Sequence, residues 1–159
     1  MIRVLFVCLG NICRSPTAEG VFRHRVAEAG LSEIIETDSA GTHGFHVGNP
    51  PDPRAEAAAS ERGIDLSDIR SRRFSQYDLA AFDYILVMDD ENFAHLLGNA
   101  STNEERERIH RLLDFASNAT QREVPDPYYG PAGGFDRVFD LIEDASAGLL
   151  HHLRTHHTL

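Results

Sequence analysis

Hydrophobic residues in this chain gather in short apolar runs, and segments with helical periodicity separate these runs. The first run, residues 2–7 (IRVLFV), is typical of a strand that is buried on both faces. Three further runs predict strands at residues 33–41, 84–88 and 108–115. Because strands alternate with helices, the pattern predicts a three-layer α/β fold, in which a four-stranded parallel sheet has helices on both faces.

The helical segments show apolar residues three and four positions apart, bounded by residue types that start or stop helices. Ser15 and Pro16 predict the N-cap and the first position of a helix that ends at Gly30. Further helices are predicted over residues 52–63, 75–82, 89–98 and 135–156. The last of these has one apolar face, formed by Phe135, Val138, Phe139, Ile142, Ala145, Leu149 and Leu153.

Length and composition restrict the class of protein. A chain of 159 residues suits one compact domain, and we expect a single domain over residues 1–159. No apolar run approaches the length of a membrane span, and the apolar start is too brief for a signal peptide, so we expect a cytoplasmic protein without membrane contact. The net charge of −10 argues against a nucleic-acid partner, although a few N–H groups and one arginine can still hold a small anion.

The segment VCLGNICRSP, residues 7–16, places both cysteines of the chain in one loop after the first strand. A disulfide between Cys8 and Cys13 would close a very short loop, so we interpret both residues as thiols. Gly10 and Asn11 are residue types that tolerate the left-handed conformations of a tightly curled loop. The N–H groups of such a loop converge, which favours the binding of a phosphate group at the carboxyl end of the strand.

Three features of this loop favour phosphate chemistry at sulfur. Convergent N–H groups, the positive end of the following helix and the planar guanidinium of Arg14 all attract a phosphate group. The same field stabilises the thiolate of Cys8, and Ser15 is placed to donate a hydrogen bond to it. A thiolate in a phosphate site attacks phosphorus and forms a phosphocysteine, which water then hydrolyses.

The leaving oxygen needs a proton, and the segment VPDPYYG, residues 124–130, offers the best candidate acid. Asp126 lies between two prolines, which hold it on a stiff, extended loop. A dianionic substrate nearby favours the protonated form of its carboxyl group. Tyr128 and Tyr129 are expected to wall the entrance and to stack on an aromatic substrate. An ordinary turn aspartate is the alternative interpretation of Asp126.

These motifs resemble those of the low-molecular-weight protein tyrosine phosphatases. The family loop V-C-x-G-N-x-C-R-S-P matches residues 7–16 at every fixed position, and the family element D-P-Y-Y matches residues 126–129. The segments DSAGT, VGNPPDPRA and FDYILVMD also resemble family segments in the same order. The resemblance implies a four-stranded parallel sheet flanked by helices, and a protein-tyrosine phosphatase that uses no metal and no cofactor.

The resemblance also implies roles for individual residues. Cys8 is the expected nucleophile, Arg14 binds the phosphate and the transition state, and Asp126 is the general acid and then the base for water. Asp89 is the expected partner of Arg14. The residues expected to bind phosphate or substrate are Leu9, Gly10, Asn11, Ile12, Cys13, Ser15, Phe45, Tyr128 and Tyr129.

Two of these residues refine the expected substrate. Phe45 stands where family members have an aromatic wall of the substrate cleft. Ile12 is the apolar residue that is usual in tyrosine-specific members, whereas relatives that act on phosphoarginine tend to have threonine there. The expected partner is therefore a protein that contains phosphotyrosine, with a tyrosine kinase as a further partner, and the chain is expected to be a monomer.

Other interpretations stay open on the sequence. The first is an arsenate reductase of the same fold that uses an external small thiol, since the thioredoxin-coupled type needs a further cysteine pair that this chain lacks. The second is a non-catalytic module that binds phosphotyrosine. Cys13 either forms a reversible disulfide with Cys8 under peroxide or is a packed thiol. The four histidines after residue 150 are interpreted as a solvated helix end rather than as a metal site.

One position departs from the family pattern. Members often have a histidine after the second helix that hydrogen-bonds the loop asparagine. Here the segment DLSDIRSRR places Ile69 at that position. Asn11 must therefore find another partner, or the loop is less rigid.

Overall fold

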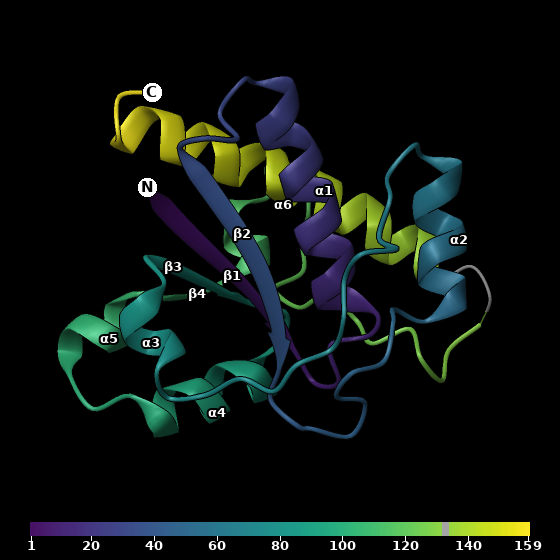
Figure 1. Ribbon diagram of the computed structural model, residues 1–159, viewed down its shortest axis with the longest axis horizontal. Coiled ribbons are helices and arrows are strands. Elements are labelled where there is room, and N and C mark those ends of the chain that lie inside the picture. The colour runs from purple at the N-terminus through teal and green to yellow at the C-terminus, as the bar shows by residue number, and fades with distance from the viewer. Residues whose placement is uncertain (132–133) are drawn as a thin grey trace.

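Four parallel strands form the sheet in the computed structural model, which describes residues 1–131 and 134–159 (Figure 1). The strands are β1 (Ile2–Cys8), β2 (Ile35–Gly41), β3 (Tyr84–Val87) and β4 (Ile109–Arg111). They pair in the order β2-β1-β3-β4, so β1 lies between two neighbours. Residues of β1 are buried on both faces of the sheet, which explains the apolar run at the start of the chain.

Helices cover both faces of the sheet, as the sequence pattern predicts (Figure 1). One face carries α1 (Arg14–Glu28) and α6 (Gly134–His156), with α2 (Pro53–Glu61) beside them. The opposite side of the molecule carries α3 (Asp78–Ala81), α4 (Asp90–Asn99) and α5 (Asn103–Glu107). The predicted fold class, a four-stranded parallel sheet between two helical layers, is confirmed.

Alternate residues of β1 supply the two layers of the core. Val4 and Phe6 pack in the core that includes α1 and α6, whereas Leu5 and Val7 pack in the core on the other face. All seven residues of the apolar face predicted for the last helix are buried in α6. The period of two in the strand and the period near 3.6 in the helix therefore both reflect real packing.

The predicted start of the first helix is wrong. Helix α1 begins at Arg14, and Cys13 rather than Ser15 is the residue that precedes it. Ser15 lies inside the first turn, where its hydroxyl group contacts the Cys8 sulfur and the Asn11 side chain. A serine next to a helix start is a good N-cap in general, but here the side chain serves the loop instead.

The fourth strand is shorter than predicted, and one short helix was not predicted. Leu112–Phe115 form the 3₁₀ turn η1, which packs against α6, so the apolar residues there reflect packing and not strand pairing. Helix α5 has no buried residue and therefore no apolar period to detect. It is capped by the hydroxyl group of Thr102, which accepts a hydrogen bond from the N–H of Glu105.

The histidines near the end of α6 are exposed, as the sequence pattern suggests. One of them also makes a polar contact, since the Tyr84 hydroxyl group and His157 Nε2 lie 2.9 Å apart. Within the ranges that the structure describes, no group of three histidine, cysteine or acidic residues is arranged to hold a metal ion. Among the same residues, no helix has both the length and the apolar character that crossing a membrane requires.

Gly148 provides a test of the packing between α6 and η1. A Cβ atom at this position would overlap the backbone carbonyl oxygen of Phe115, which cannot turn aside as a side chain can. We expect Gly148→Ala to lower the free energy of unfolding by about 1–3 kcal/mol, measured by urea denaturation. Gly98→Ala in α4 is the matched control, because a Cβ there meets no atom within 4 Å.

The control variant is expected to change the free energy of unfolding in the opposite direction. Alanine has a higher helix propensity than glycine, so Gly98→Ala is expected to raise the free energy of unfolding by about 0.5–1 kcal/mol. Equal shifts of the two variants in the same direction would show that α6 does not approach η1 as closely as the structure has it.

Candidate active site

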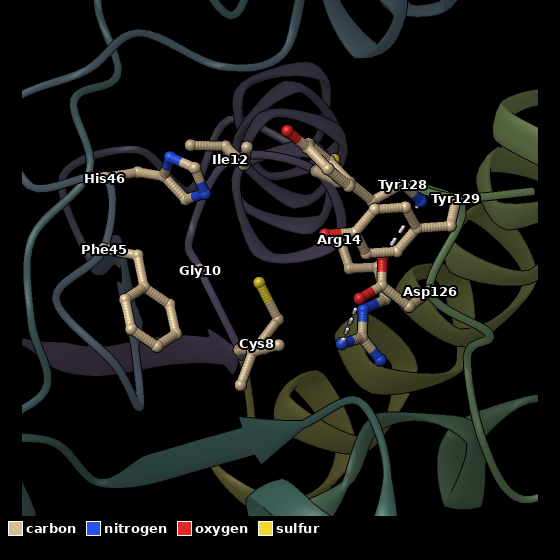
Figure 2. A pocket seen from close by; sticks show the side chains of 11 residues that line it. Cys8, Gly10, Ile12, Arg14, Phe45, His46, Asp126, Tyr128 and Tyr129 are labelled. Carbon is tan, nitrogen blue, oxygen red and sulfur yellow. Dashed lines mark hydrogen bonds and ion pairs between the residues drawn. The ribbon is translucent and has the colours of Figure 1, made fainter.

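The Cys8 sulfur lies at the carboxyl end of β1, just before α1 begins (Figure 2). The residue is 3% exposed, and Ser15 approaches the sulfur from the first turn of the helix. The Ser15 hydroxyl oxygen lies 3.0 Å from the sulfur, and the Ser15 N–H donates to it over 3.4 Å. Two donors on one sulfur stabilise negative charge on it.

The loop after Cys8 is held against the end of β2. The N–H of Thr42 donates to the Cys8 carbonyl over 2.9 Å, and the N–H of His43 donates to the Leu9 carbonyl over 3.0 Å. Gly41 makes this approach possible, because a Cβ there would lie 2.9 Å from the Leu9 carbonyl oxygen. The segment DSAGT thus braces the loop through its backbone.

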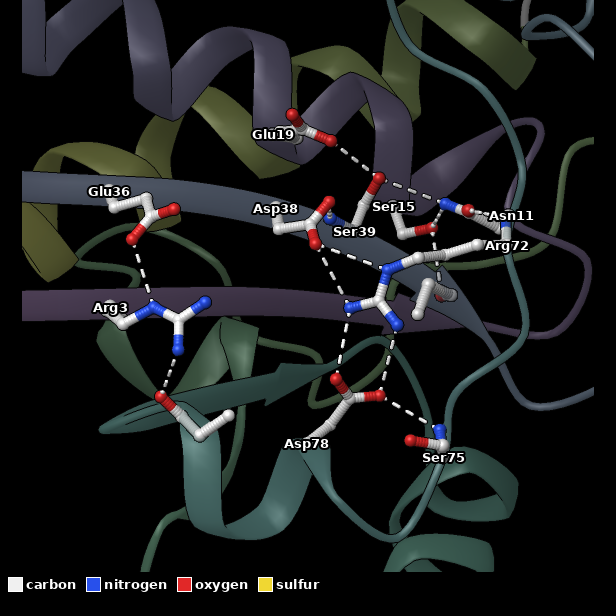
Figure 3. Close-up of polar contacts among 12 residues, drawn as sticks. Arg3, Asn11, Ser15, Glu19, Glu36, Asp38, Ser39, Arg72, Ser75 and Asp78 are labelled. Atoms are coloured by element: carbon white, nitrogen blue, oxygen red, sulfur yellow. Dashed lines mark hydrogen bonds and ion pairs between the residues drawn. The ribbon is translucent and has the colours of Figure 1, made fainter.

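Asn11 is the residue that curls the loop, with a φ of 57° in the left-handed region. Its side-chain oxygen accepts a hydrogen bond from the N–H of Arg72 over 3.0 Å. Its amide nitrogen donates to the hydroxyl oxygens of Ser15 at 2.7 Å and Ser39 at 3.0 Å (Figure 3). These contacts answer the question raised by Ile69, since Asn11 is fully hydrogen-bonded without a histidine.

Gly10 does not share this conformation. Among the described residues, the glycines with positive φ are Gly30, Gly48 and Gly63, so the left-handed conformation expected at Gly10 is wrong. The absence of a side chain at Gly10 serves another purpose. A Cβ there would lie 3.0 Å from Cδ2 of His46, so glycine makes room for this imidazole ring.

Arg14 is buried and paired, with 3% of its side chain exposed. One nitrogen of the guanidinium, Nη1, donates to Oδ2 of Asp89 over 2.7 Å and to the carbonyl of Val124 over 3.0 Å. Burial acts to lower the pKa of Arg14, but the neighbouring Cys8 sulfur and the Asp89 carboxylate outweigh it and hold the pKa above its usual value. The guanidinium therefore stays charged, and Asp89 is its partner as expected.

Asp126 faces Arg14 from the loop that follows Val124. Its Oδ2 lies 3.6 Å from Nη2 of Arg14, and its Oδ1 accepts a hydrogen bond from the N–H of Tyr128 over 3.1 Å. The carboxyl group is 40% exposed, so it can exchange protons with solvent. Residues 118 positions apart in the sequence, Cys8 and Asp126, thus line one cavity.

This cavity has a volume of about 330 Å³ (Figure 2). Cys8 and Arg14 lie at its base, and rings from two different segments form its walls. Its lining residues are Cys8, Leu9, Gly10, Ile12, Cys13, Arg14, Phe45, His46, Asp126, Tyr128 and Tyr129. Phe45 is 73% exposed and Tyr129 is 93% exposed, so both rings stand at the mouth.

The structure brings ten of the predicted site residues into this cavity and places Asn11 and Ser15 behind it. These two are almost fully buried and act on the loop from the protein side. His46 lines the cavity but was not predicted from the sequence. Its only signal was its position directly after Phe45. Ser39 and Arg72 were also missed, because nothing in their local sequence shows that they contact Asn11.

Cys13 lines the cavity beside Cys8, and both cysteines are free. Burial raises the pKa of the Cys13 thiol well above its usual value, and the nearby carboxylate of Asp52 raises it further. Cys13 is therefore a protonated thiol at neutral pH, unlike a reactive cysteine. A protective disulfide between Cys8 and Cys13 stays a prediction.

Comparisons with known proteins match almost the whole chain. The model of the family "Low molecular weight phosphotyrosine protein phosphatase" matches residues 3–158. The low molecular weight protein-tyrosine-phosphatase YfkJ of Bacillus subtilis is 45% identical over 150 residues, which are 94% of each chain. The low molecular weight phosphotyrosine protein phosphatase of Homo sapiens is 42% identical over 138 residues, 86% of this chain and 85% of that protein.

A solved structure agrees with the same family. The crystal structure of a protein tyrosine phosphatase from Entamoeba histolytica, with Hepes in its active site, has a TM-score of 0.93 and 40% identity and covers 98% of both chains. The fold, the cavity and the sequence similarity lead to one conclusion. The chain belongs to the low molecular weight phosphotyrosine protein phosphatase family.

Proposed function

We propose that this phosphatase hydrolyses phosphotyrosine in proteins, and small aryl phosphates, through a phosphocysteine formed on Cys8. One observation carries the proposal. The Cys8 sulfur, the Arg14 guanidinium and the Asp126 carboxyl group come from two distant segments of the chain and line the same cavity. A nucleophile, a cation for the phosphate and an acid for the leaving group are what such a reaction needs.

In the first step the phosphate group binds at the amino end of α1, next to Arg14. Backbone N–H groups, the helix dipole and the guanidinium together balance the charge on its equatorial oxygens. The Cys8 thiolate then attacks phosphorus, so an S–P bond forms as the bond from phosphorus to the phenolic oxygen breaks. Protonated Asp126 gives its proton to the departing oxygen, and the phenol leaves.

In the second step water releases the phosphate. Asp126, now a carboxylate, accepts a proton from a water molecule as the water oxygen attacks phosphorus. The S–P bond breaks, and the sulfur leaves as a thiolate. Ser15 supports this departure, because its hydroxyl group and its N–H lie 3.0 Å and 3.4 Å from the sulfur. Inorganic phosphate is the product, and the enzyme returns to its starting state.

The walls of the cavity favour an aryl phosphate. Phe45, Tyr128 and Tyr129 surround the mouth, and Ile12 adds an apolar contact near the sulfur. The Tyr128 and Tyr129 rings meet edge to face with centroids 4.7 Å apart, which gives the phenyl ring of a substrate a preformed surface. The phenyl ring of phosphotyrosine can pack on these side chains, whereas phosphoserine has no ring to do so.

We further infer that residues 1–159 act as one domain, and that the protein works in the cytoplasm. A nucleophilic thiol with a second thiol nearby needs a reducing compartment, which supports that location. A monomeric state and a tyrosine kinase that supplies the substrate stay predictions.

Substitution of the nucleophile and the acid tests the proposal. With an aryl phosphate, Cys8→Ser is expected to abolish turnover while the protein still binds phosphate. Asp126→Asn is expected to lower kcat by roughly 10²–10⁴-fold, and most for substrates with poor leaving groups. Glu123→Gln, on the same loop and exposed, is the matched control. A chelator should change no rate, because protein donors and Arg14 supply all the charge balance in this scheme.

The same assay separates the other functions. Preferred turnover of arsenate over aryl phosphate, with a small thiol as reductant, would indicate an arsenate reductase. Binding of phosphotyrosine peptide without any hydrolysis by the unaltered chain would indicate a binding module. Either outcome would overturn the proposal.

Asp89 tests how Arg14 is held. Asn at this position keeps an oxygen that can cap α4, as Oδ1 of Asp89 does by accepting from the N–H of Asn92. It removes the charged acceptor of Arg14, and hydrogen bonds to charged groups contribute about 1.5–3 kcal/mol. We therefore expect Asp89→Asn to lower kcat/KM by roughly ten-fold or more.

The neighbouring carboxylate is the control for this variant. Asp90 pairs with Arg111 on the surface and does not contact Arg14, so Asp90→Asn should leave kcat/KM unchanged. Similar activity of Asp89→Asn and Asp90→Asn would show that Arg14 does not depend on its ion pair.

A further inference from the structure

Glu19 is a buried carboxyl group that takes no part in the reaction as described above. It lies one turn after Ser15 on α1 and is 7% exposed. It does not line the catalytic cavity. Its Oε1 accepts a hydrogen bond from the Ser39 hydroxyl group over 2.6 Å. A buried acid so close to the phosphate-binding loop calls for a function.

Hydrogen bonds connect Glu19 through Ser39 and Asn11 to Ser15 (Figure 3), and the Ser15 hydroxyl group contacts the Cys8 sulfur. The directions of these hydrogen bonds follow from one backbone donor. The N–H of Arg72 can only donate, so the Asn11 oxygen must face it and the Asn11 amide nitrogen must face the two serines. That nitrogen donates to the hydroxyl oxygens of Ser15 and Ser39. The Ser39 proton is then free to point toward Glu19, and the Ser15 proton toward the Cys8 sulfur at 3.0 Å or the more distant Ala40 carbonyl at 3.4 Å.

Arg72 is itself held in place, so the first donor in this series of hydrogen bonds is fixed. Its guanidinium pairs with Asp38 at 3.0 Å and with Asp78 at 3.1 Å. Both serines and Asn11 are at most 2% exposed, so water does not compete for their hydrogen bonds. The orientation of Asn11 therefore depends on Arg72 at one end and on the acceptors of the two serines at the other.

We propose that Glu19 is a positioning residue, whose ionised carboxylate holds Ser39 and Asn11 and thereby keeps the phosphate-binding loop and the Ser15 hydroxyl group in their active arrangement. The inference rests on the proposed function, because it concerns the reactivity of Cys8. Asn11 has a left-handed backbone, which persists only when its surroundings hold it. A charge-assisted hydrogen bond, such as that from Ser39 to ionised Glu19, is roughly twice as strong as a neutral one.

The charged groups around Glu19 leave this carboxylate poorly neutralised. Burial raises the pKa of Glu19 to about 7, and the hydrogen bond from Ser39 opposes this effect. Asp38 on β2 and Asp68 in the segment after α2 raise the pKa further. Arg23 on α1 lowers it, but lies 4.0 Å away and pairs with Asp68 at 2.9 Å. Glu19 is therefore expected to titrate near neutral pH.

Protonation of Glu19 weakens the hydrogen bonds from Glu19 through Ser39 to Asn11 in either of two ways. If the protonated carboxyl group accepts from Ser39 through its carbonyl oxygen, the hydrogen bond becomes a neutral one. If it donates to Ser39 instead, the Ser39 proton loses its acceptor. Asn11 is held less firmly in both cases. We expect kcat to fall as the pH drops through about 7, by the same factor for good and poor leaving groups, unlike an effect on Asp126.

The experiment compares pH profiles of kcat for an aryl phosphate with a good leaving group. Glu19→Gln keeps an acceptor for Ser39 but cannot titrate, so it should lose the acid-side fall near pH 7 and have a kcat roughly five-fold below the unaltered enzyme at pH 8. Glu28→Gln, on the exposed side of the same helix, is the matched control and should keep the normal profile. An unchanged profile in Glu19→Gln would overturn the inference.

A second variant keeps the test decisive if Glu19→Gln does not fold. Ser39→Ala breaks the link between Glu19 and Asn11, so it should lose the same fall in kcat near pH 7. In the Ser39→Ala background, Glu19→Gln should then have no further effect on kcat. Additive losses of kcat from the two substitutions would mean that Glu19 does not act through Ser39, and would overturn the inference.

Thermal unfolding gives an independent readout of the same group. The ordinary pKa of glutamate is 4.5 and that of folded Glu19 is about 7, so the unfolded chain releases this proton first as the pH rises. The unaltered protein should therefore lose Tm relative to Glu19→Gln between about pH 4.5 and pH 8. A Tm difference that does not change with pH would contradict a buried, titrating Glu19. Absence of aryl phosphate turnover at every pH in the unaltered chain would instead refute the proposed function.

Discussion

Burial of one cation, the Arg14 guanidinium, is the constraint on which the site depends. A buried charge is tolerated only when it is paired and hydrogen-bonded, and Asp89 and the Val124 carbonyl meet this need on one nitrogen. Asp89 follows β3, and Val124 comes just before Asp126. The pairing therefore ties the loop after β1 to two distant segments. The second nitrogen is left facing Asp126 and the cavity, where it can meet a phosphate group.

Polar contacts hold the loop that presents Cys8 from behind, in addition to the packing of Ile12 and Cys13 in the core. Asn11 adopts a left-handed conformation, and strain of this kind costs about 1–3 kcal/mol unless the surroundings enforce it. Gly41 and Thr42 brace the loop through the backbone, and Asn11 is fixed through its amide. Catalytic geometry here is thus maintained at some expense of stability, as a buried Glu19 with a raised pKa also indicates.

Periodicity predicted the sheet and most helices, the two short motifs contained nine cavity residues, and the family resemblance added Phe45. Local sequence failed where a side chain serves a distant partner. Ser15 resembles an N-cap, but its hydroxyl group contacts the Cys8 sulfur, and Leu112 resembles strand but packs under α6. Ser39, Arg72 and His46 reach the loop only through the fold, so no spacing in the sequence marks them. Tertiary contacts of this kind are invisible to a single sequence.

Ile69 shows how the loop tolerates the loss of a family histidine. The side chain of buried Ile69 neither donates nor accepts, so the Asn11 oxygen accepts from the backbone N–H of Arg72, a donor that does not titrate. The Asn11 amide nitrogen donates to Ser39, which donates to Glu19. The nearest cation to the Glu19 carboxylate, the Arg23 guanidinium, lies 4.0 Å away. One anchor of the loop is therefore independent of pH, and the other responds to a single proton. Because the two anchors meet at one amide group, the responsive anchor loosens the loop without unfolding it.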